Sequence, residues 1–233
     1  MVALFCLMQI EKIYFMETYL GYNLEKHIIE LHGKNYTLAM VHNAYDLLDK
    51  IDPKEFAEDE KMPYWAEIWS GSIILSKWIL QQNYPKELTF LEIGAGVGPV
   101  SAILTSNGYH CTATDYDDDA LEFCKLNSEL NGGSKFLKTA FLDWRKPSLK
   151  EKYDFIVGSD IIYEVRNILP ILDVVSLNLK PGGKFYFSDP GRRPMSHLRT
   201  LVREADFNLT VVYEEQFAFR HSDQLVSIYC LEV

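Results

Sequence analysis

The residues best suited to chemistry begin with a glycine-rich segment, EIGAGVGP, at residues 92–99. Glycines let backbone amides approach a ligand closely, and a proline suits the first position of a helix. A dinucleotide fingerprint has the spacing G-x-G-x-x-G, and its third glycine would fall at position 99. That position is Pro99, and the third glycine is Gly98. The resulting pattern, E-x-G-x-G-x-G, argues against a nicotinamide dinucleotide as the ligand of this loop.

A carboxylate follows the glycine loop at the distance typical of ribose binding. Asp115 ends the second predicted strand about twenty residues on, where a carboxylate can accept hydrogen bonds from two ribose hydroxyls. Its alternative role is to cap the next helix, but Asp117 and Asp118 already offer such a cap. We therefore interpret Asp115 as a ribose-binding residue, which does not distinguish between cofactors that carry a ribose.

A second carboxylate stands at the end of another strand. Residues 154–160 read DFIVGSD, and their apolar middle is typical of a buried parallel strand. Asp160 comes at the carboxyl end of this strand, where ligands bind in such sheets. The residue caps the strand or takes part in function, and Tyr163 three positions later favours function.

These residues must be positioned by a regular alternation of helices and strands. The hydrophobic pattern predicts helices at residues 67–82, 99–106, 118–130, 165–179 and 196–205, and strands at residues 88–93, 110–114, 135–139, 155–158, 184–188, 208–213 and 225–231. Strands that alternate with helices form a parallel sheet covered on both faces. The last two strands have no helix between them. The predicted fold is α/β, a doubly wound, Rossmann-like seven-strand sheet with an antiparallel last strand.

The first 60 residues have a different character. Residues 27–32 and 36–41 are β-rich and separated by Gly-Lys-Asn, which predicts a hairpin, and Asn43 is expected to cap a short helix at residues 44–51. Residues 52–62 form an acidic run that is interpreted as a solvated loop. We predict a small N-terminal α/β extension at residues 1–60 and a cofactor-binding domain at residues 61–233.

Composition narrows the classes of function. The 233 residues carry a net charge of −10, which argues against a nucleic-acid or anionic-membrane partner. No apolar stretch reaches the roughly 20 residues that a membrane span requires. The four cysteines are scattered and no His/Asp cluster has the spacing of metal ligands, so no metal is expected. A reducing cytoplasm is the expected location.

Five segments carry a family resemblance, which covers residues 63–233. They are LEIGAGVGP at residues 91–99, Asp115, LDW at residues 142–144, SDIIY at residues 159–163 and PGG at residues 181–183. In this order they resemble the class I, seven-strand, S-adenosylmethionine-dependent methyltransferases. Trp69 and the D-x-x-Y element at residues 160–163 resemble the lysine-methyltransferase-like branch, methyltransferase family 16. The sequence departs from that branch after the tryptophan, where it reads WSGS instead of a tryptophan followed by proline or aspartate.

The resemblance implies roles for the cofactor-binding residues. The backbone of Gly94, Ala95 and Gly96 would hold the methionine part and the ribose, and Asp115 would bind the ribose diol. Glu92 would either orient the loop or reach the cofactor's amino group.

The remaining implied contacts with the cofactor come from other segments. Trp144 would pack on the adenine with Asp143 near its exocyclic amine, Trp69 would lie against the cofactor, and Ser159 belongs to the same motif as Asp160.

The resemblance also implies methyl transfer to a protein lysine by in-line displacement. A lysine amine is almost entirely protonated at pH 7, because its pKa is about 10.4. Asp160 would accept a hydrogen bond from the neutral amine and Tyr163 would position it, with no need for a metal. Orientation would then supply most of the rate.

Three alternatives remain open at this point. The first is a small-molecule N- or O-methyltransferase, because a fold does not determine its substrate. The others, both less favoured, are a nicotinamide-dependent oxidoreductase and a non-catalytic cofactor-binding protein. An adenine or glutamine-amide methyltransferase is discounted, because an Asn-Pro-Pro-aromatic element is missing where residues 159–163 read SDIIY.

Overall fold

A seven-stranded sheet forms the centre of the protein. The computed structural model describes residues 10–13, 17–45, 47, 62–205, 207–220 and 222–232. The strands of the sheet are β5 (Thr89–Ile93), β6 (His110–Asp115), β7 (Leu137–Phe141), β8 (Tyr153–Ser159), β9 (Leu179–Asp189), β10 (Asn208–Phe219) and β11 (Ser222–Glu232). Their order is β10-β11-β9-β8-β5-β6-β7. β5 to β9 pair in parallel, and β11 is antiparallel to both of its neighbours. This confirms the predicted doubly wound sheet with an antiparallel strand inserted at one end.

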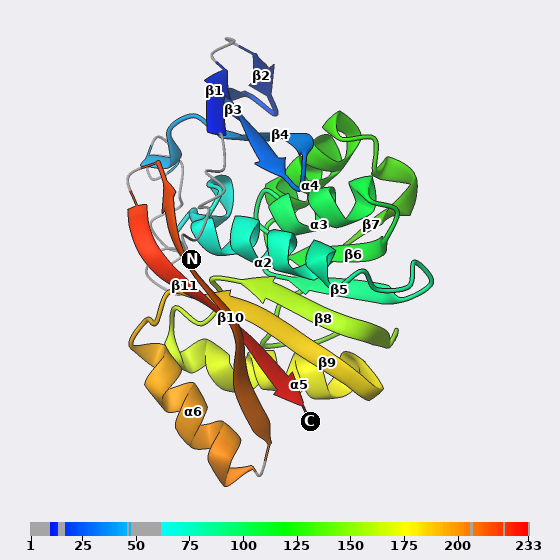
Figure 1. Cartoon of the computed structure of the whole chain (residues 1–233), viewed down its shortest axis with the longest axis vertical. Helices are drawn as coiled ribbons and strands as arrows, with labels where there is room; N and C mark the ends of the chain where they lie inside the picture. The colour runs from blue at the N-terminus through cyan, green and yellow to red at the C-terminus, as the bar shows by residue number, and fades with distance from the viewer. Residues whose placement is uncertain are drawn as a thin grey trace, which may run out of the picture.

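Helices cover both faces of this sheet. α2 (Ser70–Gln81), α3 (Pro99–Ser106) and α4 (Asp118–Leu130) lie on one face, and α5 (Ile168–Asn178) and α6 (Pro194–Glu204) lie on the other (Figure 1). Successive side chains of a strand point to opposite faces. Phe90 accordingly packs in the core under α2 and α3, whereas Leu91 packs in the core under α5 and α6. The near-continuous apolar strands of the sequence follow from this burial on two sides.

The helix and strand boundaries differ from the predicted ones mainly in the second half of the chain. The predicted helix at 165–179 begins instead with the 3₁₀ turn η4 (Val165–Asn167), and Leu179 is already the first residue of β9. β9 includes the Pro-Gly-Gly sequence that is typical of a turn, and β10 extends six residues beyond its predicted end. The extension of β10 begins with two consecutive glutamates, which interrupt the apolar pattern of the predicted strand before the buried Phe217 and Phe219.

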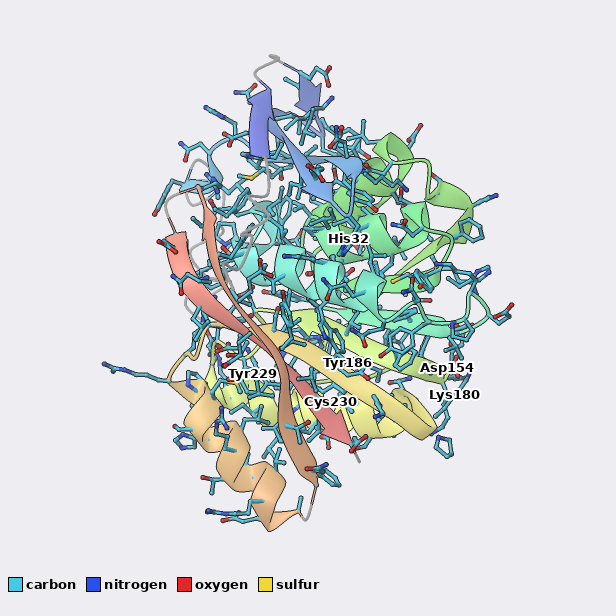
Figure 2. The ribbon with its side chains drawn as sticks, viewed as in Figure 1. His32, Asp154, Lys180, Tyr186, Tyr229 and Cys230 are labelled. Atoms are coloured by element: carbon cyan, nitrogen blue, oxygen red, sulfur yellow. The ribbon has the colours of Figure 1, made fainter. Side chains whose placement is uncertain are left out.

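The edge of the sheet opposite the cavity described below is held by an ion pair. Asp154, near the start of β8, accepts hydrogen bonds from the backbone amide and the hydroxyl of Thr89, at 2.9 and 2.8 Å. The Lys180 amine donates to the same carboxylate oxygen at 2.9 Å, and both ion-pair partners are labelled in Figure 2. These contacts lower the pKa of Asp154 in spite of its partial burial. The amino-terminal ends of β5, β8 and β9 are thereby fastened together.

The predicted N-terminal hairpin is present. β3 (Tyr22–Leu31) and β4 (Lys34–Val41) pair antiparallel across a two-residue turn at His32 and Gly33, both with positive φ. The short strands β1 (Ile10–Ile13) and β2 (Thr18–Tyr19) also pair with β3. The predicted helix at 44–51 and the acidic run at 52–62 lie almost entirely outside the described residues.

The hairpin shares its core with the helical layer. The side chain of Asn127 in α4 accepts a hydrogen bond from the Ala39 amide at 2.7 Å and donates one to the Ala39 carbonyl at 2.8 Å. Leu38 and Met40 of β4 belong to the same buried cluster as α2 and α3. The division of the chain at residue 60 stays a prediction. Among the described residues no helix is long and apolar enough to cross a membrane.

Candidate active site

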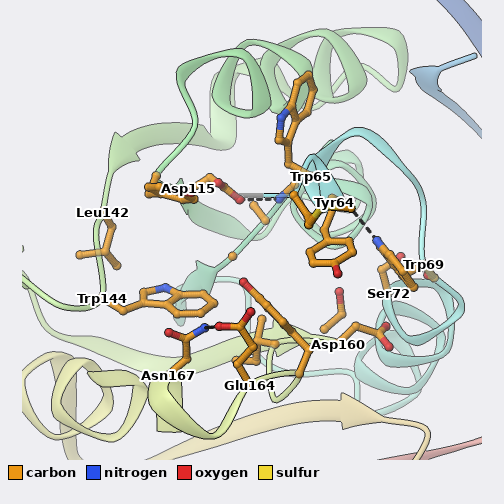
Figure 3. Close-up of a pocket in the computed structure, with 18 of the residues that line it drawn as sticks. Tyr64, Trp65, Trp69, Ser72, Asp115, Leu142, Trp144, Asp160, Glu164 and Asn167 are labelled. Carbon is orange, nitrogen blue, oxygen red and sulfur yellow. Dashed lines mark hydrogen bonds between the residues drawn. The ribbon is translucent and has the colours of Figure 1, made fainter. Parts of the chain in front are cut away.

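A cavity of about 480 Å³ opens at the carboxyl ends of the parallel strands (Figure 3). Its walls come from the loops after β5, β6, β7, β8 and β9 and from the segment before α2. The structure brings these predicted site residues together in its lining: Trp69, Gly94, Ala95, Gly96, Asp115, Asp143, Trp144, Ser159, Asp160 and Tyr163. One predicted site residue, Glu92, does not line the cavity.

The glycine loop forms the wall of the cavity beyond β5. Gly94 and Gly96 have φ values of +64° and +56°, a region that favours glycine. A Cβ on Gly94 would lie 2.8 Å from the Trp144 ring, and one on Gly96 would lie 3.0 Å from the Trp65 carbonyl oxygen. Any side chain at these two positions would therefore displace the walls of the cavity.

Asp115 connects the ends of β5 and β6. Its Oδ2 accepts a hydrogen bond from the Gly96 amide at 2.9 Å, and its Oδ1 accepts one from the Asp117 amide at 3.1 Å. Burial raises the pKa of this carboxyl from 3.8 to about 6, against the opposing effect of these amides. Asp117, not Asp115, caps α4 by accepting from the Asp119 amide. Asp115 is thus free of the capping role and faces the cavity.

Glu92 lies beneath the glycine loop. Its side chain is fully buried, and its Oε2 accepts a hydrogen bond from the Ser101 amide in the first turn of α3 at 2.9 Å. Burial raises the pKa of Glu92 from 4.5 to about 8. Alternation along β5 directs this side chain toward α3 instead of the cavity. Of its two implied roles, this placement fits the orientation of the loop.

The far end of the cavity is formed by the segment after β7. Trp144 lies on the same side of the cavity as Asp115, half-buried beside the glycine loop (Figure 3). The Asp143 carboxylate accepts hydrogen bonds from Arg145 Nε at 2.8 Å and Nη2 at 3.0 Å. This pairing lowers the pKa of Asp143, so the acid stays ionised beside the tryptophan.

Asp160 lies at the end of the cavity opposite Trp144 (Figure 3). Its φ of +58° lies in the left-handed region that non-glycine residues rarely adopt, a strain typical of functional positions. Arg192 Nη1 lies 2.6 Å from its Oδ1, and a Cβ on Gly71 at the start of α2 would lie 2.1 Å from its Oδ2. Burial raises the pKa of Asp160, while Arg192 opposes this shift. The carboxylate is thus buried in a site built from three segments.

Three aromatic rings stand beside Asp160. The Tyr64 ring packs edge-on against Tyr163 at 5.5 Å and against Trp69 at 6.1 Å between centroids. The Trp69 indole nitrogen also donates a hydrogen bond to the Tyr64 carbonyl at 3.0 Å. Tyr64 and Tyr163 are 44% and 37% exposed, so this cluster forms the open rim of the cavity. Burial and the neighbouring Glu164 raise the pKa of Tyr163 to about 12, which keeps its hydroxyl protonated.

Sequence reasoning missed several residues of the lining. Tyr64 carried no motif, and Trp65 is as plausible in a core as in a site from sequence alone. Trp65 does both, because it lines the cavity and packs against Phe123 at 5.6 Å. Arg192 also belongs to no motif that the sequence analysis used, and its partners are Asp160 and Asp189. The available sequence signal for Tyr64 was its position only five residues before Trp69.

Comparison with known proteins identifies the family. The family described as lysine methyltransferase, methyltransferase family 16, matches residues 51–197. This segment is more than half of the chain and contains every residue of the cavity described above. The protein therefore belongs to the lysine methyltransferase family.

Three curated relatives are similar to this chain. Methyltransferase-like protein 22 of Mus musculus is 26% identical over 70% of this chain and 43% of its own length. A protein N-lysine methyltransferase of Xenopus tropicalis is 34% identical over 42% of this chain and 47% of its own length. The electron transfer flavoprotein beta subunit lysine methyltransferase of Rattus norvegicus is 30% identical over 58% of this chain and 53% of its own length. The chain thus spans about half the length of these relatives.

Solved structures share the fold. The glycopeptide N-methyltransferase MtfA, complexed with S-adenosyl-L-methionine, superposes with a TM-score of 0.51 over 70% of this chain and 95% of its own, at 15% identity. A TehB-like methyltransferase of Corynebacterium glutamicum superposes with a TM-score of 0.51 over 80% of this chain and 96% of its own, at 14% identity. At these identities the likeness concerns the fold alone, which is that of Rossmann-like methyltransferases.

Proposed function

We propose that this protein transfers a methyl group from S-adenosylmethionine to the side-chain amine of a protein lysine. The observation that carries the proposal is the division of one cavity into two halves. One half has a glycine loop, a strand-end carboxylate and a tryptophan, Trp144. The other half has Asp160 within a cluster of aromatic rings.

The first half fits the cofactor. Gly94 and Gly96 line the cavity with bare backbone, so a ligand can lie directly against their peptide groups. The Asp115 carboxylate faces the cavity at the end of β6 and is suited to the two ribose hydroxyls. Trp144 offers a ring face for the adenine. When bound, S-adenosylmethionine supplies an electrophilic methyl group.

The second half fits an amine. Asp160 would accept a hydrogen bond from the amine nitrogen and orient its lone pair, while the amine's proton leaves to solvent. Tyr64 and Tyr163 would enclose the aliphatic stem, and their ring faces favour a positive centre in the methylated product. Both rings are partly exposed, so a side chain projecting from a protein surface can reach them. Orientation by these groups would supply most of the rate.

A protein substrate is favoured over a small molecule. Membership of the lysine methyltransferase family and the names of the Xenopus and rat relatives support this choice. The small-molecule alternative is supported by a ubiquinone biosynthesis O-methyltransferase of Shewanella pealeana, 22% identical over 66% of this chain and 69% of its own length. The acidic net charge of −10 favours a cationic partner over nucleic acid, and a cytoplasmic location remains part of the proposal.

The proposal is tested with methyl-labelled S-adenosylmethionine and a cell lysate fractionated into proteins and small molecules. Label on lysine in a protein band, identified by mass spectrometry, is the expected result. The Asp160→Ala variant serves as the control, and it should bind S-adenosylhomocysteine nearly as well as wild type while its methyl transfer falls by orders of magnitude. Label that appears only in the small-molecule fraction would overturn the choice of a protein substrate.

A further inference from the structure

Arg192 lies in the loop between β9 and α6 and reaches into the half of the cavity that holds Asp160 and the aromatic rings. This half is called the acid–aromatic half below. Its Nη1 is 2.6 Å from Asp160 Oδ1 and 3.3 Å from Asp189 Oδ2. Its guanidinium carbon lies 5.6 Å from the centre of the Trp69 ring. One cation thus contacts two carboxylates and an aromatic ring of the site.

The loop holds Arg192 in this place. Asp189 ends β9 with a fully buried side chain, and its Oδ1 accepts hydrogen bonds from the amides of Gly191 and Arg192, both at 2.7 Å. The position of Arg192 is therefore set by the backbone as well as by its ion pairs. Arg193, the next residue, is exposed and does not line the cavity, which makes it a matched control.

Charged and polar groups face Asp160 from three neighbouring elements. Arg192 approaches from the β9–α6 loop, Asp189 and the Ser188 hydroxyl from β9, and the Gly71 amide from the start of α2. Arg192 is the charged group among them that stabilises the anionic form of Asp160, whereas burial and Asp189 destabilise it. A guanidinium keeps its charge throughout the physiological pH range.

We propose that Arg192 is a positioning residue of the methyl-acceptor site, which keeps Asp160 anionic and disfavours a protonated acceptor amine beside it. The inference rests on the proposed function. An isolated Asp160 carboxylate would form a salt bridge with an incoming ammonium group and so stabilise the form that has no lone pair. Because Arg192 lies 2.6 Å from that carboxylate and offsets part of its charge, the ammonium gains less from it.

The consequence is that more of the acceptor amine is in its neutral form. A like charge close to an amine lowers the amine's pKa, the device by which lysine nucleophiles beside a second cation are activated. The amine gives its proton to water and keeps its electron pair, which can then form the new N–C bond. Asp160 remains ionised and accepts a hydrogen bond from the neutral amine through one of its remaining lone pairs.

The first experiment compares kcat at saturating substrate as a function of pH for wild type, Arg192→Gln, Arg192→Lys and Arg193→Gln, because kcat reports ionisations in the complex in which the acceptor amine is bound. Loss of the charge in Arg192→Gln should move the acidic limb of the profile upward by about one pH unit, which is about a tenfold loss of rate at neutral pH. Arg192→Lys should keep the limb near its wild-type position, and Arg193→Gln should match wild type. A limb in Arg192→Gln that superposes on wild type would overturn the inference, even if the rate were lower.

A second measurement has a readout other than activity. The free energy of unfolding is measured for Arg192→Gln, Asp160→Asn and the double variant, and the binding of S-adenosylhomocysteine is measured for each. The effect of the double variant on the unfolding equilibrium constant should differ from the combined effects of the two single variants by about tenfold. The affinity for S-adenosylhomocysteine should be the same in all of them. Additive effects in a protein that methylates lysine would overturn this inference alone. Absence of transfer by the wild-type protein to any amine would overturn the proposed function, and with it the acceptor role of Arg192.

Discussion

The backbone amide of Gly96 donates a hydrogen bond of 2.9 Å to the Asp115 carboxylate and so links the loop after β5 to the end of β6. The same carboxylate accepts from the Asp117 amide, which connects it to the start of α4. The acid expected to bind the ribose therefore also sets the shape of the glycine loop. Loss of the acid should weaken cofactor binding through both effects.

Asp115→Ala should weaken S-adenosylhomocysteine binding by about 10- to 100-fold, because hydrogen bonds to a charged group contribute about 1.5–3 kcal/mol. Isothermal titration calorimetry measures the effect. Asp118→Ala is the control, since Asp118 is an exposed acid in the first turn of α4. Equal affinity in Asp115→Ala and wild type would remove Asp115 from the cofactor site.

Tyr64 is expected to act through its ring. Tyr64→Phe should keep kcat/KM for the protein substrate close to wild type, because the ring contacts with Trp69 and Tyr163 are preserved. Tyr64→Ala should lower kcat/KM by about tenfold, since one aromatic contact contributes roughly 0.5–1.5 kcal/mol beyond its buried area. Steady-state kinetics on the methylated protein would measure both values. A loss in Tyr64→Phe as large as that in Tyr64→Ala would instead assign the role to the hydroxyl.

Gly71 is in contact with the acid of the site. A methyl group at this position would lie 2.1 Å from Asp160 Oδ2 and 2.6 Å from the Ser188 hydroxyl. Gly71→Ala should therefore displace Asp160 and abolish most of the methyl transfer, and it should destabilise the fold by about 1–3 kcal/mol. Activity and urea unfolding test the two effects separately. A stabilised and fully active variant, the usual result of glycine to alanine in a helix, would contradict this packing.

The buried Glu92 should make stability depend on pH. Its carboxyl ionises at 4.5 in an unfolded chain and at about 8 when folded, so between these values the folded protein holds a proton that the unfolded chain has released. The free energy of unfolding should therefore fall as the pH rises through this window, by at most about 1.4 kcal/mol per pH unit. The raised pKa of Asp115 also makes the free energy of unfolding fall as the pH rises, but only up to about pH 6.

Glu92→Gln isolates this contribution, because the amide does not ionise and its oxygen can still accept from Ser101. Relative to wild type the variant should be more stable at pH 8 than at pH 6.5. Urea unfolding at the two values provides the comparison. Parallel pH profiles for the two proteins would show that Glu92 does not carry a buried proton.

Local sequence patterns predicted the seven-stranded sheet and the half of the cavity that fits the cofactor. Apolar runs of strand length and periodic helices follow from burial on both faces, so β5, β6, β8, α3 and α4 could be located from the sequence. The glycine loop and Asp115 lie next to these elements in the chain. The start of α5 and the length of β10 were mispredicted, because a 3₁₀ turn precedes α5 and two consecutive glutamates interrupt the apolar pattern of β10 before Phe217 and Phe219.

The acid–aromatic half depends on contacts between distant segments. Arg192 meets Asp160 only because β8 and β9 are neighbours and their loops turn toward each other. Tyr64 meets Tyr163 across the mouth of the cavity. The burial of Glu92 was available from the alternation of β5, which places it on the same face as Phe90.

Thermal unfolding with S-adenosylhomocysteine, and separately with NAD, tests the central claim most directly. A ligand at 100 times its dissociation constant adds about 2.7 kcal/mol to the free energy of unfolding, a rise of roughly 5–10 °C in Tm for a protein of this size. We predict a rise with S-adenosylhomocysteine that is clearly smaller in Asp115→Ala at the same ligand concentration, and no rise with NAD. A rise with NAD alone, or with neither ligand, would contradict the assignment of this cavity as an S-adenosylmethionine site.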